Sequence, residues 1–335
     1  MEESTQCRTR PPARDFCDFI KALAQEGNSI GAPPRAPARD CAAGSPWGLS
    51  AAALKWIALA AMTIDHINRC LLVTNARLEG VPALSCIGKL APTLFLFLVT
   101  ESLRRTSDRG RYCLRLLAAG FFGGAAIALA NVLIFGAADC FLPRNVLLDY
   151  FYVACIVLSV DSIRRACRGA HGRTLLYGPL LLALGLLLPL CLPVLADAFG
   201  AGGDAPGAFL RAVLLIAGRT EYPAGFLLLG VLWYACRSRK AQCRMLAGFF
   251  LLSAAVFLLP LEAPFWFTGR LLTAVRWLLW QLSGLLPEPM PGMLFAIPLL
   301  LLYNGRCGRQ IKLLFYVYYP AHSWALFLLG ALLHG

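Results

Sequence analysis

The segment LSAAALKWIALAAMTIDHINRCLLV, residues 49–73, is long and apolar enough to cross a bilayer as one helix, yet it contains Asp65 and His66. The hydrocarbon core of a membrane offers no water to a polar side chain, and an aspartate near the middle of a helix costs about 2.5–3.5 kcal/mol on insertion scales. Two interpretations of the pair stay open. It is either a site for catalysis, proton movement or ligand binding, or an interhelical hydrogen bond that fixes packing.

The composition of the whole chain agrees with a membrane location. Hydrophobic residues make up 59% and charged residues 15%, and the mean hydropathy is +0.65, whereas soluble domains carry about 25% charge. We therefore expect an all-α integral membrane protein with about nine transmembrane helices and one interfacial amphipathic helix. Residues 47–335 form one polytopic membrane domain in this interpretation, and the Pro- and Arg-rich residues 1–46 form a disordered cytoplasmic tail.

The net charge of +13 comes from basic residues that gather in short loops between the apolar segments. These residues include Arg104, Arg105, Arg109, Arg111, Arg164, Arg165, Arg168, Arg173, Arg237, Arg239, Lys240, Arg244, Arg306, Arg309 and Lys312. Such loops face the cytoplasm, which predicts a multi-pass protein of the cell membrane with a cytoplasmic N-terminus. The same arrangement argues against nucleic acid as a partner. We expect the loops to orient the chain and to contact anionic lipid head groups or a cytoplasmic anionic ligand.

The apolar segments between these loops predict the membrane spans. They cover residues 49–73, 82–101, 113–136, 145–163, 174–196, 208–236, 242–261, 290–304 and 313–333. The span 208–236 is interrupted by polar residues at 219–223, and irregular backbone at membrane depth is tolerated only where it is buried in protein or lines a cavity. Residues 263–286 suit the interfacial helix, because charged and aromatic residues recur along them.

Two histidines at membrane depth are the candidate catalytic residues. His66 lies in the first span, and the adjacent Asp65 can pair with Arg69, which follows it by one helical turn. His322 lies in the last span, in the stretch YYPAH (318–322), with two tyrosines one turn before it on the same side. A helical histidine beside aromatic residues is equally compatible with a satisfied core position.

Other polar residues at membrane depth widen the set of candidates. They are Lys89, Glu101, Asn131, Asn145, Asp149, Glu221 and Asn304. Lys89 and Glu101 either extend to the membrane surface, as long charged side chains do, or serve a function. The thirteen cysteines show no C-x-x-C pair and no Cys/His grouping at metal spacing, which predicts neither a disulfide framework nor a metal site. The chain also lacks a P-loop and a dinucleotide-binding fingerprint.

Several stretches of the chain follow one family pattern in order. They are LKWIA (54–58), MTIDHI (62–67), IGKLAP with Phe95 and Phe97, RYCLRLL (111–117), Glu221-Tyr222, LYNG (302–305) and FYVYYPAH (315–322). On these residues the chain resembles the TraX family, which is named for its conjugative pilin acetylase. It departs from the family pattern at four positions. Lys89 replaces an arginine, Pro92 is displaced relative to the Phe-Pro step of the pattern, Glu221 replaces an aspartate, and Pro223 replaces a glycine.

The resemblance implies a multi-pass acyltransferase that uses acetyl-CoA to acetylate a pilin-like protein or another envelope amine or hydroxyl. We expect His66 to be the general base, Asp65 to set the local field, and His322 or Tyr319 to assist at the carbonyl oxygen. The residues expected to bind the donor are Lys89, Arg69, Glu221 and Tyr319, without a metal. Two other classes stay open: a proton-coupled transporter and a non-catalytic assembly protein for pili or envelope complexes.

Overall fold

The computed structural model describes residues 47–68, 81–135, 145–167, 174–199, 205–218, 221–222, 224–236, 238–258, 291–309 and 312–334. The expected tail 1–46, Arg69 and the expected interfacial helix 263–286 lie outside these ranges. Within the described part the secondary structure is helical, apart from one isolated parallel bridge between Leu49 and Tyr303. This confirms the all-α class.

The helices follow one another along the chain with loops between them. They are α2 (Ala51–Ile67), α3 (Pro82–Gly88), α4 (Leu90–Arg105), α5 (Arg109–Phe135), α6 (Val146–Ala166), α7 (Thr174–Leu186), α8 (Leu188–Phe199), α9 (Ala205–Gly218), α10 (Ala224–Ala235), α11 (Arg239–Leu258), the 3-10 turn η4 (Pro291–Met293), α13 (Ala296–Leu302) and α14 (Lys312–His334).

Three stretches of described helix are long and apolar enough to cross a membrane: Ala83–Arg105, Arg109–Ile134 and Val146–Ala166. A fourth span results if the bent pair Tyr177–Leu186 and Leu188–Ala198 counts as one. These helices fit a membrane protein. Three or four spans among the described residues do not confirm the expected nine.

The expected spans differ from the helices mainly where proline interrupts the chain. The span expected at 174–196 divides into α7 and α8, which are bent by 51° at their junction. Pro189 is the second residue of α8, where its missing N–H is no loss because the first N–H groups of a helix have no partner within it. The span expected at 290–304 contains only the short helix α13 after η4. The break expected within 208–236 is confirmed, since α9 and α10 lie on either side of it.

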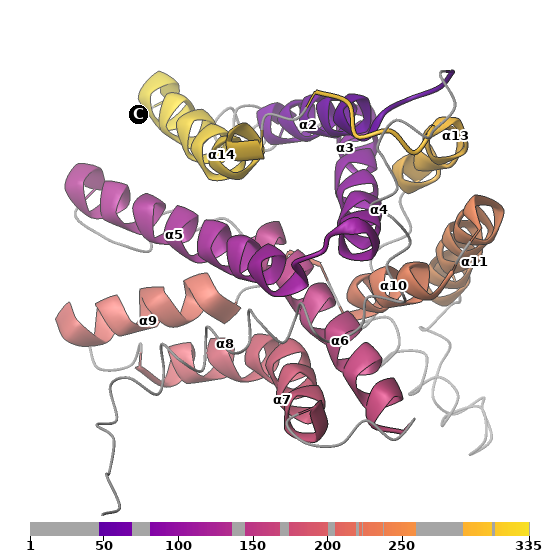
Figure 1. Cartoon of the computed structure of the whole chain (residues 1–335). Coiled ribbons are helices and arrows are strands. Elements are labelled where there is room, and N and C mark those ends of the chain that lie inside the picture. Colours follow the sequence, from indigo (N-terminus) through magenta and orange to yellow (C-terminus); the bar gives the residue numbers. More distant parts are fainter. Residues whose placement is uncertain are drawn as a thin grey trace, which may run out of the picture.

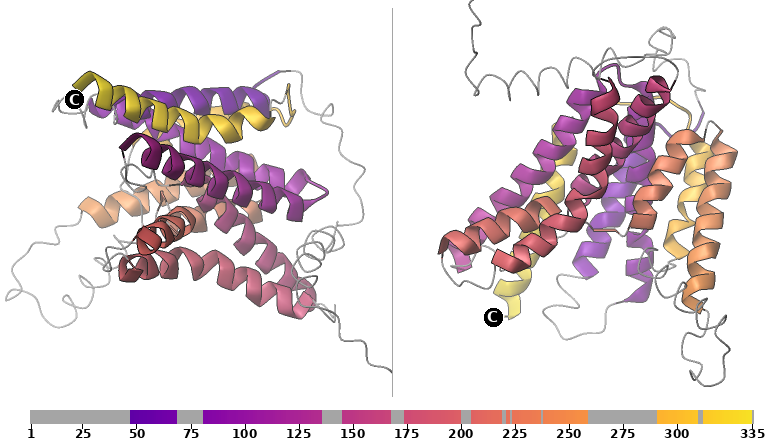
Figure 2. Two further views of the ribbon diagram at one scale, coloured as in Figure 1. Left: turned by 90° about the vertical axis from the view of Figure 1, so that its left-hand side faces the viewer. Right: turned by 90° about the horizontal axis from the view of Figure 1, so that it is seen from below.

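Helix α2 lies beside α14 along one edge of the bundle, and α4 packs against α2 (Figures 1 and 2). Helix α6 contacts α5, α7 and α10, and α8 packs on α9 at the opposite edge (Figure 1). The first and last described helices of the chain are therefore neighbours. This arrangement places the two candidate histidines on adjacent helices.

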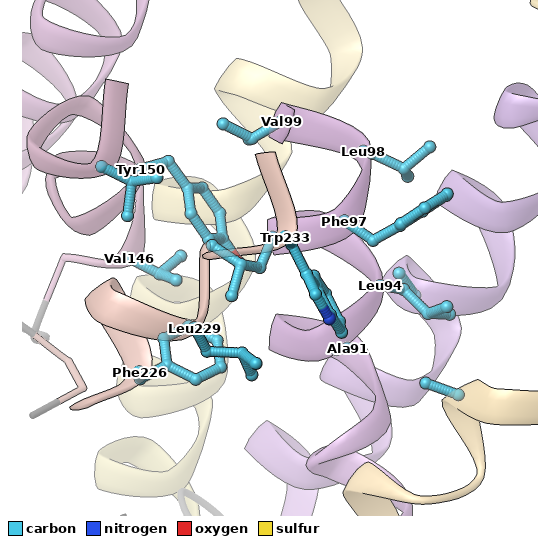
Figure 3. Close-up of a cluster of buried hydrophobic side chains, with 14 of the residues drawn as sticks. Ala91, Leu94, Phe97, Leu98, Val99, Val146, Tyr150, Phe226, Leu229 and Trp233 are labelled. Atoms are coloured by element: carbon cyan, nitrogen blue, oxygen red, sulfur yellow. The ribbon is translucent and has the colours of Figure 1, made fainter. Parts of the chain in front are cut away.

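The centre of the bundle is formed by α4, α6 and α10, whose buried side chains interlock (Figure 3). Phe97 of α4 and Phe226 and Trp233 of α10 are fully buried there. Lipid tails are as apolar as these side chains, so the helices are held together by close packing rather than by exclusion of water. Gly230 of α10 permits the close approach, because a Cβ at that position would lie 2.7 Å from the Leu96 Cδ1 atom.

The loop 303–309 returns to the start of α2 and caps it. The N–H of Ala51 donates to the Arg306 carbonyl at 2.8 Å, and the N–H of Ala52 donates to the Cys307 carbonyl at 3.0 Å. Both belong to the first N–H groups of a helix, which lack partners within it. Cys307 is also disulfide-bonded, so the chain has a disulfide where its cysteine spacing predicts none. Spacing does not reveal which distant segments a fold brings together.

Candidate functional site

The fold brings together the two candidate histidines, which are 256 residues apart in the chain. His66 lies in the last turn of α2, and His322 lies within α14. The His66 Nδ1 atom is 2.6 Å from the His322 Nε2 atom, and the ring planes are inclined by 23° with centroids 4.7 Å apart. His322 is buried and His66 is half-buried. We call these two residues the histidine pair.

The hydrogen bonds around the histidine pair assign its protons. His322 Nδ1 lies 2.7 Å from the Tyr318 carbonyl oxygen, and because a carbonyl only accepts, this nitrogen carries a proton. In a neutral His322 the Nε2 atom is then an acceptor, so His66 Nδ1–H donates to it. The basic lone pair of His66 consequently falls on its Nε2 atom. Both imidazoles are neutral in this arrangement, which avoids the cost of burying a charge.

Ser323 supports the donor side of the histidine pair. Its hydroxyl donates to the Tyr319 carbonyl at 3.2 Å, and its oxygen lies 3.2 Å from His66 Nδ1. Since the hydroxyl proton points to the carbonyl, the oxygen can accept from the same Nδ1–H that His322 receives. The sequence carries no spacing signal for Ser323, because its contact with His66 arises only when α2 and α14 pack together.

Tyr318 supports His322 from the other side. Its ring stacks on the His322 ring, with centroids 4.7 Å apart and an angle of 12° between the planes. Thr63 donates its hydroxyl proton to the Leu59 carbonyl at 2.8 Å, so the Tyr318 hydroxyl, which is 2.8 Å from the Thr63 oxygen, donates to it. The predicted stacking of the tyrosine on His322 is therefore present, and the structure adds Thr63 as the residue that anchors it.

Asp65 packs beside the start of α4. Its side chain is buried, and a Cβ built on Gly88 would lie 2.3 Å from Asp65 Cβ and 2.6 Å from its Oδ1 atom. Only glycine leaves room at that position. Adjacent helical residues point about 100° apart, so Asp65 faces α3 and α4 while His66 faces α14. The expected pairing with Arg69 lies outside the described residues and stays a prediction.

Lys89 lies at the turn between α3 and α4, directly after Gly88. Its ammonium group is 5.7 Å from the centroid of the Tyr222 ring. Tyr222 and Glu221 lie at the break between α9 and α10, and their backbone N–H groups donate to the carboxylate of Asp149 at 3.0 and 3.1 Å. Asp149 is fully buried in α6 and so fixes the broken helix. The sequence marks Asp149 as polar at membrane depth but does not reveal this role.

Tyr319 lies near the histidine pair, with its ring centroid 6.2 Å from that of His322. Its hydroxyl oxygen accepts the backbone N–H of Val146 at 3.2 Å, which is the first residue of α6. The side-chain oxygen of Asn145 accepts the next N–H, that of Leu147, at 3.2 Å. Tyr319 therefore joins α14 to the start of α6. Among the predicted residues, the structure thus gathers His66, His322 and Tyr319, and places Asp65, Lys89 and Glu221 around the start of α4.

A second polar site lies at the other end of α4. The Glu101 carboxylate is buried and accepts hydrogen bonds from Arg104, Arg105 and Arg239. We call these four residues the arginine cluster. The Glu101 side chain is therefore enclosed by arginine partners and does not extend into solvent. The position of Arg239 in a loop of the sequence does not by itself predict its pairing with Glu101. Gly88, at the end of α3, packs on Asp65 next to the histidine pair. At 1.5 Å per helical residue, Gly88 and Glu101 are about 20 Å apart along α3 and α4, and this is the separation of the two polar sites.

The space between the two polar sites is filled with apolar side chains. Leu54 and Ala58 of α2 and Leu94 and Phe97 of α4 are fully buried at this level. Phe97 packs edge-on against Trp233 with ring centroids 6.1 Å apart (Figure 3). The histidine pair and the arginine cluster are therefore distinct sites.

The comparison with protein families matches residues 50–190 to the model described as TraX protein. The match begins just before α2 and ends within α8, so it contains His66, Asp65 and Lys89, whereas Glu221 and His322 lie beyond it. No curated protein and no solved structure matches the chain. Over residues 50–190 the chain is therefore similar to the TraX family, which supports the resemblance inferred from its sequence motifs.

Proposed function

We propose that this protein is a membrane-embedded acyltransferase that moves an acetyl group from acetyl-CoA to an amine or hydroxyl acceptor. The proposed acceptor is the N-terminal amine of a pilin-like protein or a similar envelope group. The observation that carries the proposal is the hydrogen-bonded histidine pair among apolar helices. The resemblance to a conjugative pilin acetylase supports it, and the proposed chemistry needs no metal.

In the proposed reaction the acceptor nitrogen attacks the thioester carbonyl, so that a C–N bond forms and the C–S bond breaks. His66 Nε2 takes the proton from the acceptor nitrogen and returns it to the departing thiolate, which leaves as the free coenzyme thiol. The enzyme ends in its starting protonation state. General base catalysis of this kind contributes about 10²–10⁴-fold to a rate.

His322 is proposed to act through His66 rather than on the acyl group. When His66 Nε2 gains a proton, its Nδ1–H becomes a stronger donor, and the His322 Nε2 atom receives it at 2.6 Å. This interaction stabilises the imidazolium and holds the ring in one orientation, which is the role of the third group in a catalytic triad. His322 is therefore a positioning residue in this proposal.

Lys89 supplies positive charge beside the start of α4, on the same level of the bundle as Asp65. We propose that Lys89 stabilises the negative charge that develops on the thioester oxygen, because a fixed cation in a water-poor site stabilises such a transition state. The Tyr222 ring lies next to Lys89 at the break between α9 and α10. We assign Tyr222 and the adjacent Glu221 to substrate binding.

The experiment measures transfer of labelled acetyl groups from acetyl-CoA by membranes that contain the wild-type protein or the His66→Ala variant. The matched control is His334→Ala, a histidine at the end of the same helix as His322. We expect about a 10²–10⁴-fold loss of transfer for His66→Ala and none for His334→Ala. Unchanged transfer by inserted His66→Ala protein contradicts the proposal. If the inserted His66→Ala protein also supports pilus assembly, the acyltransferase proposal is replaced by a non-catalytic assembly function.

A proton-coupled transporter is the second candidate, because the described part of the chain contains the bent helix pair α7–α8 and the separate helices α9 and α10 on either side of the break at 219–223. Transporters use broken helices at their binding sites. In this chain the histidine pair lies on α2 and α14 instead. Proton flux in proteoliposomes distinguishes the two candidates, since only a transporter moves protons without a CoA thioester.

A further inference from the structure

The arginine cluster joins three guanidinium groups to one carboxylate. Glu101 Oε1 accepts from Arg104 at 2.8 Å, and Glu101 Oε2 accepts from Arg105 at 3.1 Å and from Arg239 at 3.2 Å. The Glu101 side chain is 7% exposed. Three positive charges thus meet one negative charge at a half-buried position, and two positive charges stay uncompensated within the cluster.

Arg104 has a structural task in this cluster. Its Nη2 atom donates to the carbonyl oxygens of Trp233, Tyr234 and Cys236 at the end of α10. These carbonyls lie in or directly after the last turn of α10, where a helix leaves carbonyl groups without partners in the helix itself. The Trp233 carbonyl also accepts the N–H of Cys236 at 3.2 Å and the side-chain amide of Gln242 at 3.2 Å. Arg104 therefore ties the end of α10 to α4, and we do not assign it to a ligand.

Arg105 and Arg239 keep hydrogen-bonding capacity. Arg105 donates to Glu101 and to the Gly305 carbonyl, and Arg239 donates to Glu101 and to the Gln242 side chain. A guanidinium carries five N–H donors, so each of these two arginines directs only part of its donors to described residues. Their side chains are 40% and 29% exposed, so the remaining donors can reach a ligand from outside the bundle.

Aromatic rings hold these two guanidinium groups in place. The Arg239 guanidinium lies 4.7 Å from the centroid of Phe97 and 4.6 Å from that of Tyr303. The Arg105 guanidinium lies 5.7 Å from the centroid of the same Tyr303 ring. The two arginines are thus preorganised next to each other on one carboxylate oxygen.

We propose that Arg105 and Arg239 bind a phosphomonoester dianion at this end of the bundle. The two negative charges of such a group match the two uncompensated positive charges, and planar guanidinium groups bind phosphate oxygens with paired N–H donors. The phosphomonoester is carried either by a nucleotide or by a lipid such as phosphatidic acid. The proposal does not rest on acyl transfer, because the site is separate from the histidine pair.

The experiment uses the full-length protein in nanodiscs of neutral phosphatidylcholine. In the first arm, calorimetry measures binding of adenosine 3′,5′-bisphosphate. In the second arm, thermal unfolding compares nanodiscs that contain phosphatidic acid with nanodiscs that contain phosphatidylglycerol, a phosphodiester lipid of lower charge. Binding in the first arm identifies a nucleotide ligand, and selective stabilisation by phosphatidic acid in the second identifies a lipid ligand.

The variants are Arg105→Gln and Arg239→Lys, and the matched control is Arg244→Gln, an exposed arginine on the same helix as Arg239. Arg105→Gln leaves Glu101 with two arginines, and Arg239→Lys keeps the charge but removes the planar fork, so both retain counter-charges for the buried carboxylate. We expect each variant to weaken binding about tenfold or more and the control to match the wild type. The proposal is overturned if neither arm detects binding, or if both variants bind as the wild type does.

Discussion

The histidine pair and the arginine cluster lie at opposite ends of α4, and each satisfies buried polar groups in a different way. The histidine pair is neutral, and its protons are assigned by neighbouring carbonyl and hydroxyl groups. The arginine cluster is charged and has more positive than negative groups. A neutral pair avoids the cost of burying a charge, whereas partly exposed arginine side chains keep their charge in contact with solvent. The neutral site is therefore suited to moving a proton, and the charged site is suited to holding an anion.

The largest effect on stability is expected from Glu101→Gln. This change leaves three guanidinium groups without their carboxylate, and losing one partner of a buried ion pair typically costs 3–5 kcal/mol. Because the arginine side chains are partly exposed, solvent screens them, and we expect about 2–3 kcal/mol. The measurement is thermal or denaturant unfolding in a fixed detergent.

Asp108→Asn is the matched control for Glu101→Gln, since Asp108 pairs with the exposed Arg111 and asparagine can still accept the Arg111 backbone N–H that Asp108 receives at the start of α5. A surface pair of this kind contributes little to stability. Equal losses of stability in the two variants show that Glu101 is no more important than a surface carboxylate, which contradicts the distinction between the two sites.

A smaller effect is expected from Gly88→Ala, which tests the packing of Asp65. The added Cβ would lie 2.3 Å from Asp65 Cβ, so the helices must shift, at a cost of about 1–3 kcal/mol. The shift also moves Lys89, so acetyl transfer should fall with stability. The measurements are thermal unfolding and transfer of labelled acetyl groups.

Gly248→Ala is the control, because among the described residues no atom outside the neighbouring backbone of α11 lies within 4 Å of a Cβ at that position. Alanine favours a helix over glycine by about 0.5–1 kcal/mol. We therefore expect Gly248→Ala to be neutral or stabilising. A Gly88→Ala protein as stable and active as Gly248→Ala would show that Asp65 does not need its present position.

The smallest effect is expected from Ser323→Ala, which removes one acceptor of the His66 Nδ1–H group but keeps the other. A single hydrogen bond contributes about 0.5–1.5 kcal/mol, so acetyl transfer should fall about 2–10-fold. The control is Ser253→Ala, because the Ser253 hydroxyl has no hydrogen-bond partner among the described residues. A Ser323→Ala rate equal to that of the control removes Ser323 from the support of the histidine pair.

Local patterns in the sequence predict much of the helical structure. Apolar length predicts the helices that contain His66, Glu101 and His322, and the polar residues at 219–223 predict the break between α9 and α10. These features depend on neighbours within one helix or one turn. The same logic marks His66, His322 and Glu101 as unusual, because any polar residue at membrane depth stands out.

Contacts between distant helices could not be predicted in this way. The hydrogen bond between His66 and His322 joins residues 256 positions apart, and the role of Asp149 depends on where α6 packs against the broken helix. The sequence predicts that Arg239 is one of the basic loop residues that orient the chain, yet in the structure it pairs with the buried carboxylate of Glu101 on another helix. Side-chain periodicity carries no information on which helix faces which.

The most direct test of the account is a double-mutant cycle in the histidine pair. It measures acetyl transfer by His66→Ala, His322→Ala and the double variant, each with insertion into the membrane verified. If His322 acts only through His66, the double variant is no slower than His66→Ala, because residues that act as a unit are not additive. Losses that multiply in the double variant, or full activity of His322→Ala, would contradict the claim that the two imidazoles form one catalytic pair.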